Sequence, residues 1–154
     1  MLKITDSDSG VYCLVIECSS STLIECRSFN NISFNKGYYY YAGSAQKNLS
    51  KRIERHIRKD KKIHWHIDYL SAHPNFEIKG VLIFKDKKKS FECLLSKDLN
   101  DNFRLKAGAL HFGNSDCDKC ATHLYYSPKR IPYSHFISRY QSIVRLIPSS
   151  SKTF

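Results

Sequence analysis

Two tyrosines and a pair of basic residues at helical spacing are the side chains in this sequence best suited to chemistry. Tyr12 and Tyr41 each lie in an apolar, strand-like run with a glycine two positions away. Arg52 and His56 are four residues apart beside an apolar helical stripe, so their side chains point the same way. A planar guanidinium can hold two phosphate oxygens at once, and histidine or tyrosine can move or orient a proton. These residue types favour chemistry on a phosphate group, provided that the fold brings them together.

The charge balance favours a polyanionic partner. Lysine and arginine number 25 against 14 aspartates and glutamates, a net charge of +11. Such a surplus favours nucleic acid or an anionic membrane surface. No apolar run approaches the roughly 18 residues that a membrane helix needs, so nucleic acid is preferred over the membrane. Asp6 and Asp8 stand where a signal peptide would be basic and then apolar, which favours a cytoplasmic protein with its six cysteines reduced.

The hydrophobic pattern predicts a single α/β domain over residues 1–148, followed by a frayed tail at 149–154. We expect a small central sheet, mixed or antiparallel, flanked by helices. Within the aromatic run, alternation places Tyr39 and Tyr41 on one face of a strand and Tyr38 and Tyr40 on the other. Strands are predicted at 10–16, 38–42 and 78–84, with one or two short strands in 23–34, and helices at 48–59, 64–72, 90–99 (with Ser90 as N-cap) and 133–146.

Several short motifs in this order resemble the GIY-YIG nuclease family. The first motif stands as Gly10-Val11-Tyr12 and the second as Tyr41-Ala42-Gly43. The family's helical arginine falls on Arg52, the residue four later is His56, and the family's metal-binding glutamate would be Glu92. A closer resemblance, to the Uri-type endonuclease branch, rests on the motifs Tyr41–Ala45, Arg55–Arg58, Trp65–Leu70, Phe112–Cys117 and His123-Leu124.

The resemblance implies a metal-dependent endonuclease acting on DNA, with single-stranded or branched DNA and a repair role as the finer expectation. In the family's usual scheme Tyr12 takes a proton from water, and Tyr41 contacts the scissile phosphate or shares that work. Arg52 bridges phosphate oxygens, and His56 orients a tyrosine or the water. Glu92 binds Mg²⁺ or Mn²⁺ as one hard oxygen ligand. The nucleic acid is expected to contact Gly43, Ser44, Lys51, Arg55, Arg58, His66 and Asp68, with the basic runs 52–62 and 85–89 as phosphate tracks.

The sequence departs from the family pattern in spacing. Between Tyr12 and Tyr41 lie 28 residues, an excess that we attribute to an inserted strand within 23–34. The step from Gly43 to Arg52 is about one residue longer than expected, so Lys51 is a rival for the phosphate-binding role. A tyrosine titrates near pH 10, so a tyrosine base requires a cation that lowers its pKa.

Two other groups of residues have competing interpretations. Trp65 and Tyr69 either pack in the core, which is slightly preferred, or stack on unpaired bases. Asp68 either faces the nucleic acid or holds the nearby His64 in place. Late in the chain, Cys117, Cys120 and His123 resemble half of a zinc site, with His111 or Asp116 as a further ligand. Because the second pair of a usual finger is missing, we prefer a hydrogen-bonded knot that supports the site, formed by Ser115, Asp116 and His123, with Asn114 as the candidate for the family's late asparagine.

Three functions therefore compete. The first is the endonuclease. The second is a non-catalytic nucleic-acid-binding module on the same fold, and the third is a small zinc-stabilised interaction protein.

Overall fold

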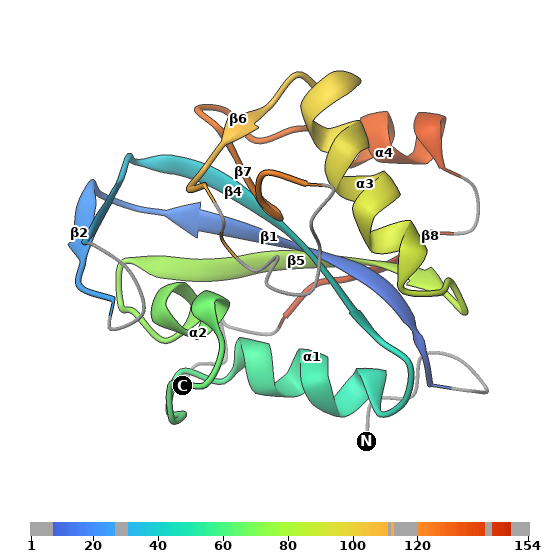
Figure 1. Ribbon diagram of the computed structural model, residues 1–154, viewed down its shortest axis with the longest axis horizontal. Helices are drawn as coiled ribbons and strands as arrows, with labels where there is room; N and C mark the ends of the chain where they lie inside the picture. The colour runs from blue at the N-terminus through green and yellow to red at the C-terminus, as the bar shows by residue number, and fades with distance from the viewer. Residues whose placement is uncertain (1–7, 27–30, 111, 113–119, 141–142, 149–154) are drawn as a thin grey trace.

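A six-stranded antiparallel sheet flanked by helices forms the centre of the protein (Figure 1). The computed structural model describes residues 8–26, 31–110, 112, 120–140 and 143–148. The sheet has the order β6-β7-β4-β1-β5-β8, and β2 and β3 form a separate two-stranded ribbon. The predicted α/β class is therefore confirmed, with an antiparallel sheet. The strands are β1 (Gly10–Cys18), β2 (Thr22–Ile24), β3 (Ile32–Phe34), β4 (Gly37–Ala45), β5 (Phe76–Lys85), β6 (Lys106–Ala107), β7 (Leu124–Ser127) and β8 (Ile143–Leu146).

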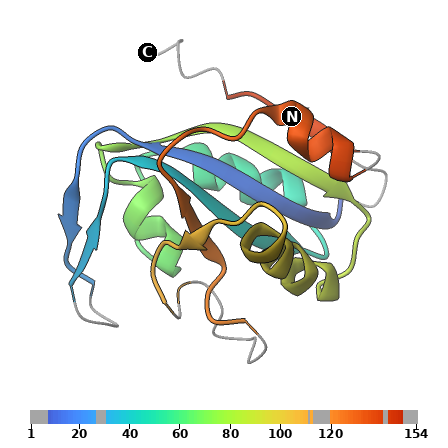
Figure 2. The ribbon, with the colours of Figure 1, turned by 90° about the horizontal axis from the view of Figure 1, so that it is seen from above.

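Helices cover both faces of this sheet, which explains why its central strand β1 is apolar at nearly every position. Strand β1 lies between β4 and β5, and its alternate residues enter two different cores. Tyr12 and Leu14 face one core with Tyr41, while Val11 and Cys13 face the other with Tyr40. Figures 1 and 2 show α1 and α2 on one side of the sheet and α3 and α4 on the other. The helices are α1 (Leu49–Ile57), α2 (His66–Ser71), α3 (Ser90–Asp101) and α4 (Tyr133–Arg139).

Helix α1 is held by the residues that precede strand β1. The Asp8 carboxylate accepts hydrogen bonds from the backbone N–H of Ser50, at 3.0 Å, and from its hydroxyl, at 2.8 Å. The backbone N–H of Leu49 donates to the Asp8 carbonyl oxygen. A negative side chain at these first N–H groups also complements the helix dipole. These hydrogen bonds hold the start of α1 next to the N-terminal end of β1, which carries Tyr12.

Two sequence predictions about helices are wrong. The predicted helix at 133–146 stops at Arg139, and residues Ile143–Leu146 instead add strand β8 beside β5. The reason is their alternation: Val144 packs against one core and Ile143 against the other, which suits a strand and not a helix. Ser90 is the first residue of α3 and not its cap, which is Lys89 without a capping side chain. The inserted segment forms two short strands, β2 and β3, in agreement with the prediction of one or two strands in 23–34.

No helix in the described part of the chain combines the length and the apolar character that a membrane crossing requires.

Candidate active site

Tyr12 and Tyr41 lie on neighbouring strands and face the same core. The register of β1 and β4 places Tyr12 opposite Gly43, whose lack of a side chain makes room for the tyrosine ring. A Cβ atom at Gly43 would come within 2.5 Å of the Tyr12 ring and its hydroxyl oxygen. Gly43 is buried against the Tyr12 ring, so its position does not support the predicted contact with nucleic acid.

Helix α1 brings two basic side chains to these tyrosines. The hydroxyl oxygen of Tyr12 lies 2.8 Å from Nε2 of His56, a residue only 1% exposed. The other ring nitrogen of His56, Nδ1, is buried and has no hydrogen-bond partner among the described residues. Arg52 lies one turn earlier, and its Nη1 donates to the carbonyl oxygen of Ser44 at 2.7 Å. Lys51, its rival, is exposed, so Arg52 is the basic residue that contacts the site.

Glu92 reaches the same place from the other side of the sheet. Strand β7 pairs with β4 only over Tyr38–Tyr41, and beyond that point the backbone N–H of Ala42 donates to the carbonyl oxygen of His123. Glu92, in the first turn of α3, contacts β4 two residues further along, at Ser44. Its Oε1 accepts the Ser44 hydroxyl at 2.6 Å, and its Oε2 lies 2.7 Å from Nδ1 of His123. Ser44 thus links the carboxylate to Arg52 through its two oxygens.

Burial determines the protonation of both tyrosines. Burial, followed by the neighbouring Tyr41, raises the pKa of Tyr12 well above its ordinary value, and the charge of Glu92 adds to this. Arg52 lowers the pKa of Tyr12 but does not offset the burial. The pKa of Tyr41 is also raised, chiefly by burial and then by Glu92. Both phenols are therefore protonated near neutral pH in the protein alone, and Tyr12 can act as a base only if its own proton leaves.

His56 makes the stability of the fold depend on pH. Burial, with Lys61 as the next cause, lowers the pKa of His56 to about 3 from an ordinary value of 6.5. Between these values the unfolded chain binds a proton that the folded protein does not, so stability rises with pH and falls on acidification. We expect the free energy of unfolding to drop by roughly 2 kcal/mol between pH 6.5 and 5, at about 1.4 kcal/mol per pH unit.

Urea unfolding at a series of pH values measures this loss. In His56→Gln, which has no ionisable ring, most of the loss should disappear. His66 contributes a smaller part, because burial lowers its pKa as well. A wild-type curve that stays flat between pH 6.5 and 5 would contradict the burial of a neutral His56.

Of the residues expected to contact nucleic acid, some are buried and support the fold, while others are exposed. Asp68 is fully buried and pairs with both Nη atoms of Arg55 at 2.9 Å. It also accepts the backbone N–H of His64, so its supporting role is confirmed and its direct contact with nucleic acid is corrected. His66 is partly buried against Phe112. Lys51 and Arg58 are exposed on α1 or just beyond it.

Trp65 lies at the surface beside the site. Trp65 is 37% exposed, so its interpretation as a core residue is wrong. The guanidinium carbons of Arg52 and Arg55 lie 5.0 and 4.6 Å from the centre of its ring. An exposed indole next to two guanidinium groups is an arrangement suited to aromatic and anionic ligands.

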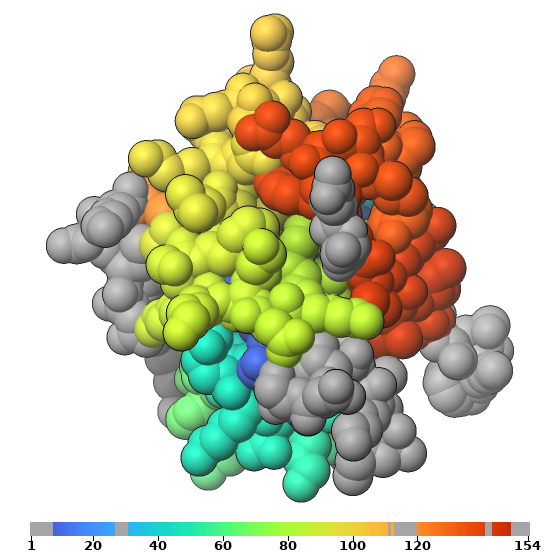
Figure 3. Space-filling view, turned by 90° about the vertical axis from the view of Figure 1, so that its right-hand side faces the viewer, coloured from blue at the N-terminus to red at the C-terminus, as the bar shows by residue number. Residues whose placement is uncertain are grey.

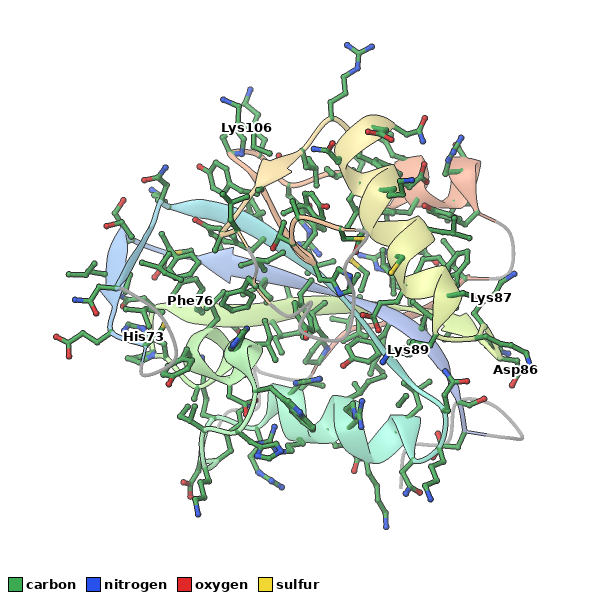
Figure 4. All side chains as sticks on the ribbon, viewed as in Figure 1. His73, Phe76, Asp86, Lys87, Lys89 and Lys106 are labelled. Carbon is green, nitrogen blue, oxygen red and sulfur yellow. The ribbon has the colours of Figure 1, made fainter. Side chains whose placement is uncertain are left out.

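Basic side chains border the site from two elements. Residues of the β5–α3 turn at 85–89, which include four lysines, are all exposed. Figure 4 shows Asp86, Lys87 and Lys89 at this turn, away from Lys106 at the opposite edge. In Figure 3 the teal residues of α1 lie directly below the yellow-green residues of α3 and its preceding turn. The lysine-rich turn at 85–89 therefore lies on the same side of the molecule as the near end of α1 (Figure 3).

A second group of candidate metal ligands lies next to Glu92. Ligand atoms of Cys93, Cys120 and His123 lie within 4.8 Å of one another. Sequence reasoning paired Cys120 and His123 with Cys117 and missed Cys93, because nothing local relates residues 27 positions apart in the chain. The predicted residues His111, Asn114, Ser115, Asp116 and Cys117 lie outside the described part of the chain.

Comparison with known proteins identifies the family. Neither the curated proteins nor the solved structures include a match to this chain. Residues 11–145 match the family model described as "Domain of unknown function DUF123", and this range contains Tyr12, Arg52 and Glu92. The chain belongs to the DUF123 domain family.

Proposed function

We propose that this protein is a metal-dependent endonuclease that hydrolyses phosphodiester bonds in DNA. The observation that supports this most strongly is the meeting of five side chains from β1, β4, α1 and α3. Tyr12 contacts His56, and Arg52 and Glu92 are joined through Ser44, while Tyr41 packs beside His56 with ring centres 6.5 Å apart. These are the residue types that phosphodiester hydrolysis needs, and they match the order of the GIY-YIG motifs.

In the proposed reaction, Tyr12 and His56 move the proton of the attacking water. Tyr12 accepts this proton on its hydroxyl oxygen while its own proton passes to Nε2 of His56. Neutral His56 can accept it if the ring carries its hydrogen on Nδ1, and the low pKa of the free ring favours returning the proton promptly to the leaving oxygen. This exchange avoids a free phenolate, which the raised pKa of Tyr12 disfavours.

Arg52 and Glu92 are assigned to neutralising the negative charge of the phosphate, Arg52 directly and Glu92 through a metal ion. The guanidinium of Arg52 would bind phosphate oxygens in a bidentate way and stabilise the negative charge that grows on them. Glu92 fits a hard cation such as Mg²⁺ or Mn²⁺, because its carboxylate is largely buried and held in place by Ser44 and His123. Such an ion would neutralise phosphate charge, and a single protein carboxylate implies weak affinity for the free ion.

The burial of both tyrosines favours a second candidate function. Tyr12 and Tyr41 are each less than a tenth exposed, as core tyrosines are. A non-catalytic nucleic-acid-binding module would use the exposed lysines of the 85–89 turn and Trp65, and would keep Tyr12 for packing alone.

The deciding experiment incubates the protein with end-labelled single-stranded, duplex and forked DNA, and with single-stranded RNA. Each substrate is tested with Mg²⁺, Mn²⁺ or EDTA, for the wild type and for Glu92→Gln. Cutting that requires the metal and is lost in Glu92→Gln supports the nuclease. Binding of any of these substrates without cutting by the wild type would replace it with the binding module. The substrate that is cut also decides between DNA and RNA.

Trp65 provides a prediction about substrate form. Because an exposed aromatic side chain stacks on unpaired bases, Trp65→Ala should weaken single-stranded DNA binding by about 10-fold, corresponding to 1–3 kcal/mol per stacked base. Duplex DNA, whose bases are already stacked, should lose much less. Fluorescence anisotropy with labelled single-stranded and duplex oligonucleotides measures both affinities. The control is Leu94→Ala, which removes an exposed apolar side chain from α3. An equal loss for both forms would show that Trp65 acts only by positioning Arg52 and Arg55.

A further inference from the structure

A cluster of two cysteines and a histidine lies beside the proposed active site, and none of the three takes part in the proposed reaction. Cys93 follows Glu92 in α3, while Cys120 and His123 lie just before β7. Their ligand atoms are within 4.8 Å of one another. A tetrahedral zinc ion with Zn–S bonds of about 2.3 Å and Zn–N bonds of about 2.0 Å separates its ligand atoms by roughly 3.5–3.8 Å. The widest of the separations between these ligand atoms therefore exceeds the tetrahedral spacing by about 1 Å at most.

Hydrogen bonds hold His123 to β4, and Cys120 lies against α3. The backbone N–H of His123 donates to the carbonyl oxygen of Phe112 at 2.9 Å. The carbonyl oxygen of His123 accepts the backbone N–H of Ala42, in β4, at 3.0 Å. The sulfur of Cys120 lies 3.9 Å from the carbonyl oxygen of Cys93, so the loop before β7 packs directly on α3. The ligands thus come from two elements whose relative position is determined by the sheet, and metal binding would require little reordering of the chain.

His123 connects this cluster to Glu92. Its Nδ1 lies 2.7 Å from Glu92 Oε2, so Nε2 is the nitrogen assigned to a metal. Histidines that bind zinc commonly donate their second N–H to a carboxylate, which orients the ring and raises its basicity. Glu92 would then be oriented from one side by a zinc-bound histidine and from the other by the Ser44 hydroxyl.

We propose that Cys93, Cys120 and His123 bind one zinc ion, with a solvent molecule in the fourth position, and that this zinc positions Glu92 through His123. The two sulfurs bind as thiolates, so each zinc ion taken up releases two thiol protons to solvent. Soft thiolate ligands select zinc over Mg²⁺ or Mn²⁺, so this site is distinct from the hard-cation site assigned to Glu92.

The test measures metal and not cleavage, so it remains informative if the chain proves not to be a nuclease. The full chain is purified under reducing conditions, and its zinc content is determined by mass spectrometry. The zinc-free protein is then titrated with Co²⁺ under reducing conditions. The site predicts about one zinc per chain, and Co²⁺ should produce the intense thiolate-to-cobalt charge-transfer band and the visible bands of tetrahedral cobalt.

Variants identify the ligands. Cys93→Ser and Cys120→Ser should each lose most of the charge-transfer band. Cys18→Ser should keep all of it, because a serine hydroxyl can still donate to the Ser20 carbonyl oxygen that the Cys18 sulfur contacts. Glu92→Gln should retain the band but bind zinc about 10- to 100-fold more weakly, as loss of a carboxylate behind a zinc-bound histidine does.

Three outcomes would overturn the proposal. The first is wild-type protein that contains no zinc and gives no thiolate-cobalt band. The second is a band that persists unchanged in both Cys93→Ser and Cys120→Ser, which would place the metal on other cysteines. The third is a disulfide between Cys93 and Cys120 in protein kept under reducing conditions, detected by mass spectrometry of alkylated peptides. Because all three readouts use the wild type or compare it with soluble variants, a variant that fails to fold does not decide the result.

Discussion

Arg52→Lys is expected to lower the rate of metal-dependent cleavage by about 100-fold or more while changing nucleic-acid affinity only a few-fold. Lysine keeps the positive charge but loses the planar fork that can bind two phosphate oxygens. It also loses the geometry by which Arg52 donates to Ser44, the residue whose hydroxyl donates to Glu92. Single-turnover cleavage with saturating protein measures the rate, and anisotropy measures the affinity.

Lys51→Ala is the matched comparison on the same helix. Lys51 is exposed and lies next to Arg52 in the chain, so its loss should reduce affinity and lower the salt dependence of binding by about one ion while leaving the cleavage rate intact. Thermal unfolding of each variant shows whether α1 has been preserved. The assignment of Arg52 fails if Lys51→Ala loses the cleavage rate and Arg52→Lys retains it.

Asp68→Ala is expected to reduce the free energy of unfolding by about 3–5 kcal/mol, a large part of the 5–15 kcal/mol typical of a domain. Asp68 is fully buried and accepts hydrogen bonds from Arg55 and from the backbone N–H groups of His64 and Trp65. Its removal takes the carboxylate away from the Arg55 guanidinium and leaves the N–H groups of His64 and Trp65, at the start of α2, without this acceptor. Urea unfolding measures the loss.

Asp60→Ala, an exposed aspartate between α1 and α2, should change the same free energy by less than about 0.5 kcal/mol. The double variant Arg55→Ala with Asp68→Ala should lose much less than the sum of the single variants, since it removes both charges of one pair. Additive losses would show that the two residues stabilise the fold independently.

Asp68 also makes the free energy of unfolding depend on pH in the acid range. Burial raises the pKa of its carboxyl, but the bonds from Arg55, Trp65 and His64 outweigh burial and hold the pKa below its ordinary value. A depressed carboxyl pKa stabilises the fold above the ordinary value near 4, and this stabilisation is lost as the pH falls through the lowered value. His56 acts in a higher range, beginning below pH 6.5, so the two effects can be separated by pH.

Much of the secondary structure could be predicted because burial on both faces leaves a clear pattern. Strand β1 is apolar at nearly every position, and the alternation of Tyr39 and Tyr41 with Tyr38 and Tyr40 is found in the two cores. The stripe of Leu49 and Ile53 predicted α1, which ends at Ile57 because Arg58 takes an extended backbone conformation. The C-terminal segment could not be predicted in the same way, since its apolar residues acquire their strand only by pairing with β5.

The sequence by itself determined the inventory of the candidate site: the residue types Tyr12, Tyr41, Arg52, His56 and Glu92, and the excess of positive charge around them. Only the tertiary structure decided how they meet. Strand pairing places Gly43 opposite Tyr12, the packing of α1 directs His56 at the tyrosine hydroxyl, and Glu92 meets His123 just before β7 begins. The same packing brings Cys93 to Cys120 and turns Asp68 inward. Contacts between distant residues depend on which surfaces are buried together, and no local spacing along the chain encodes that choice.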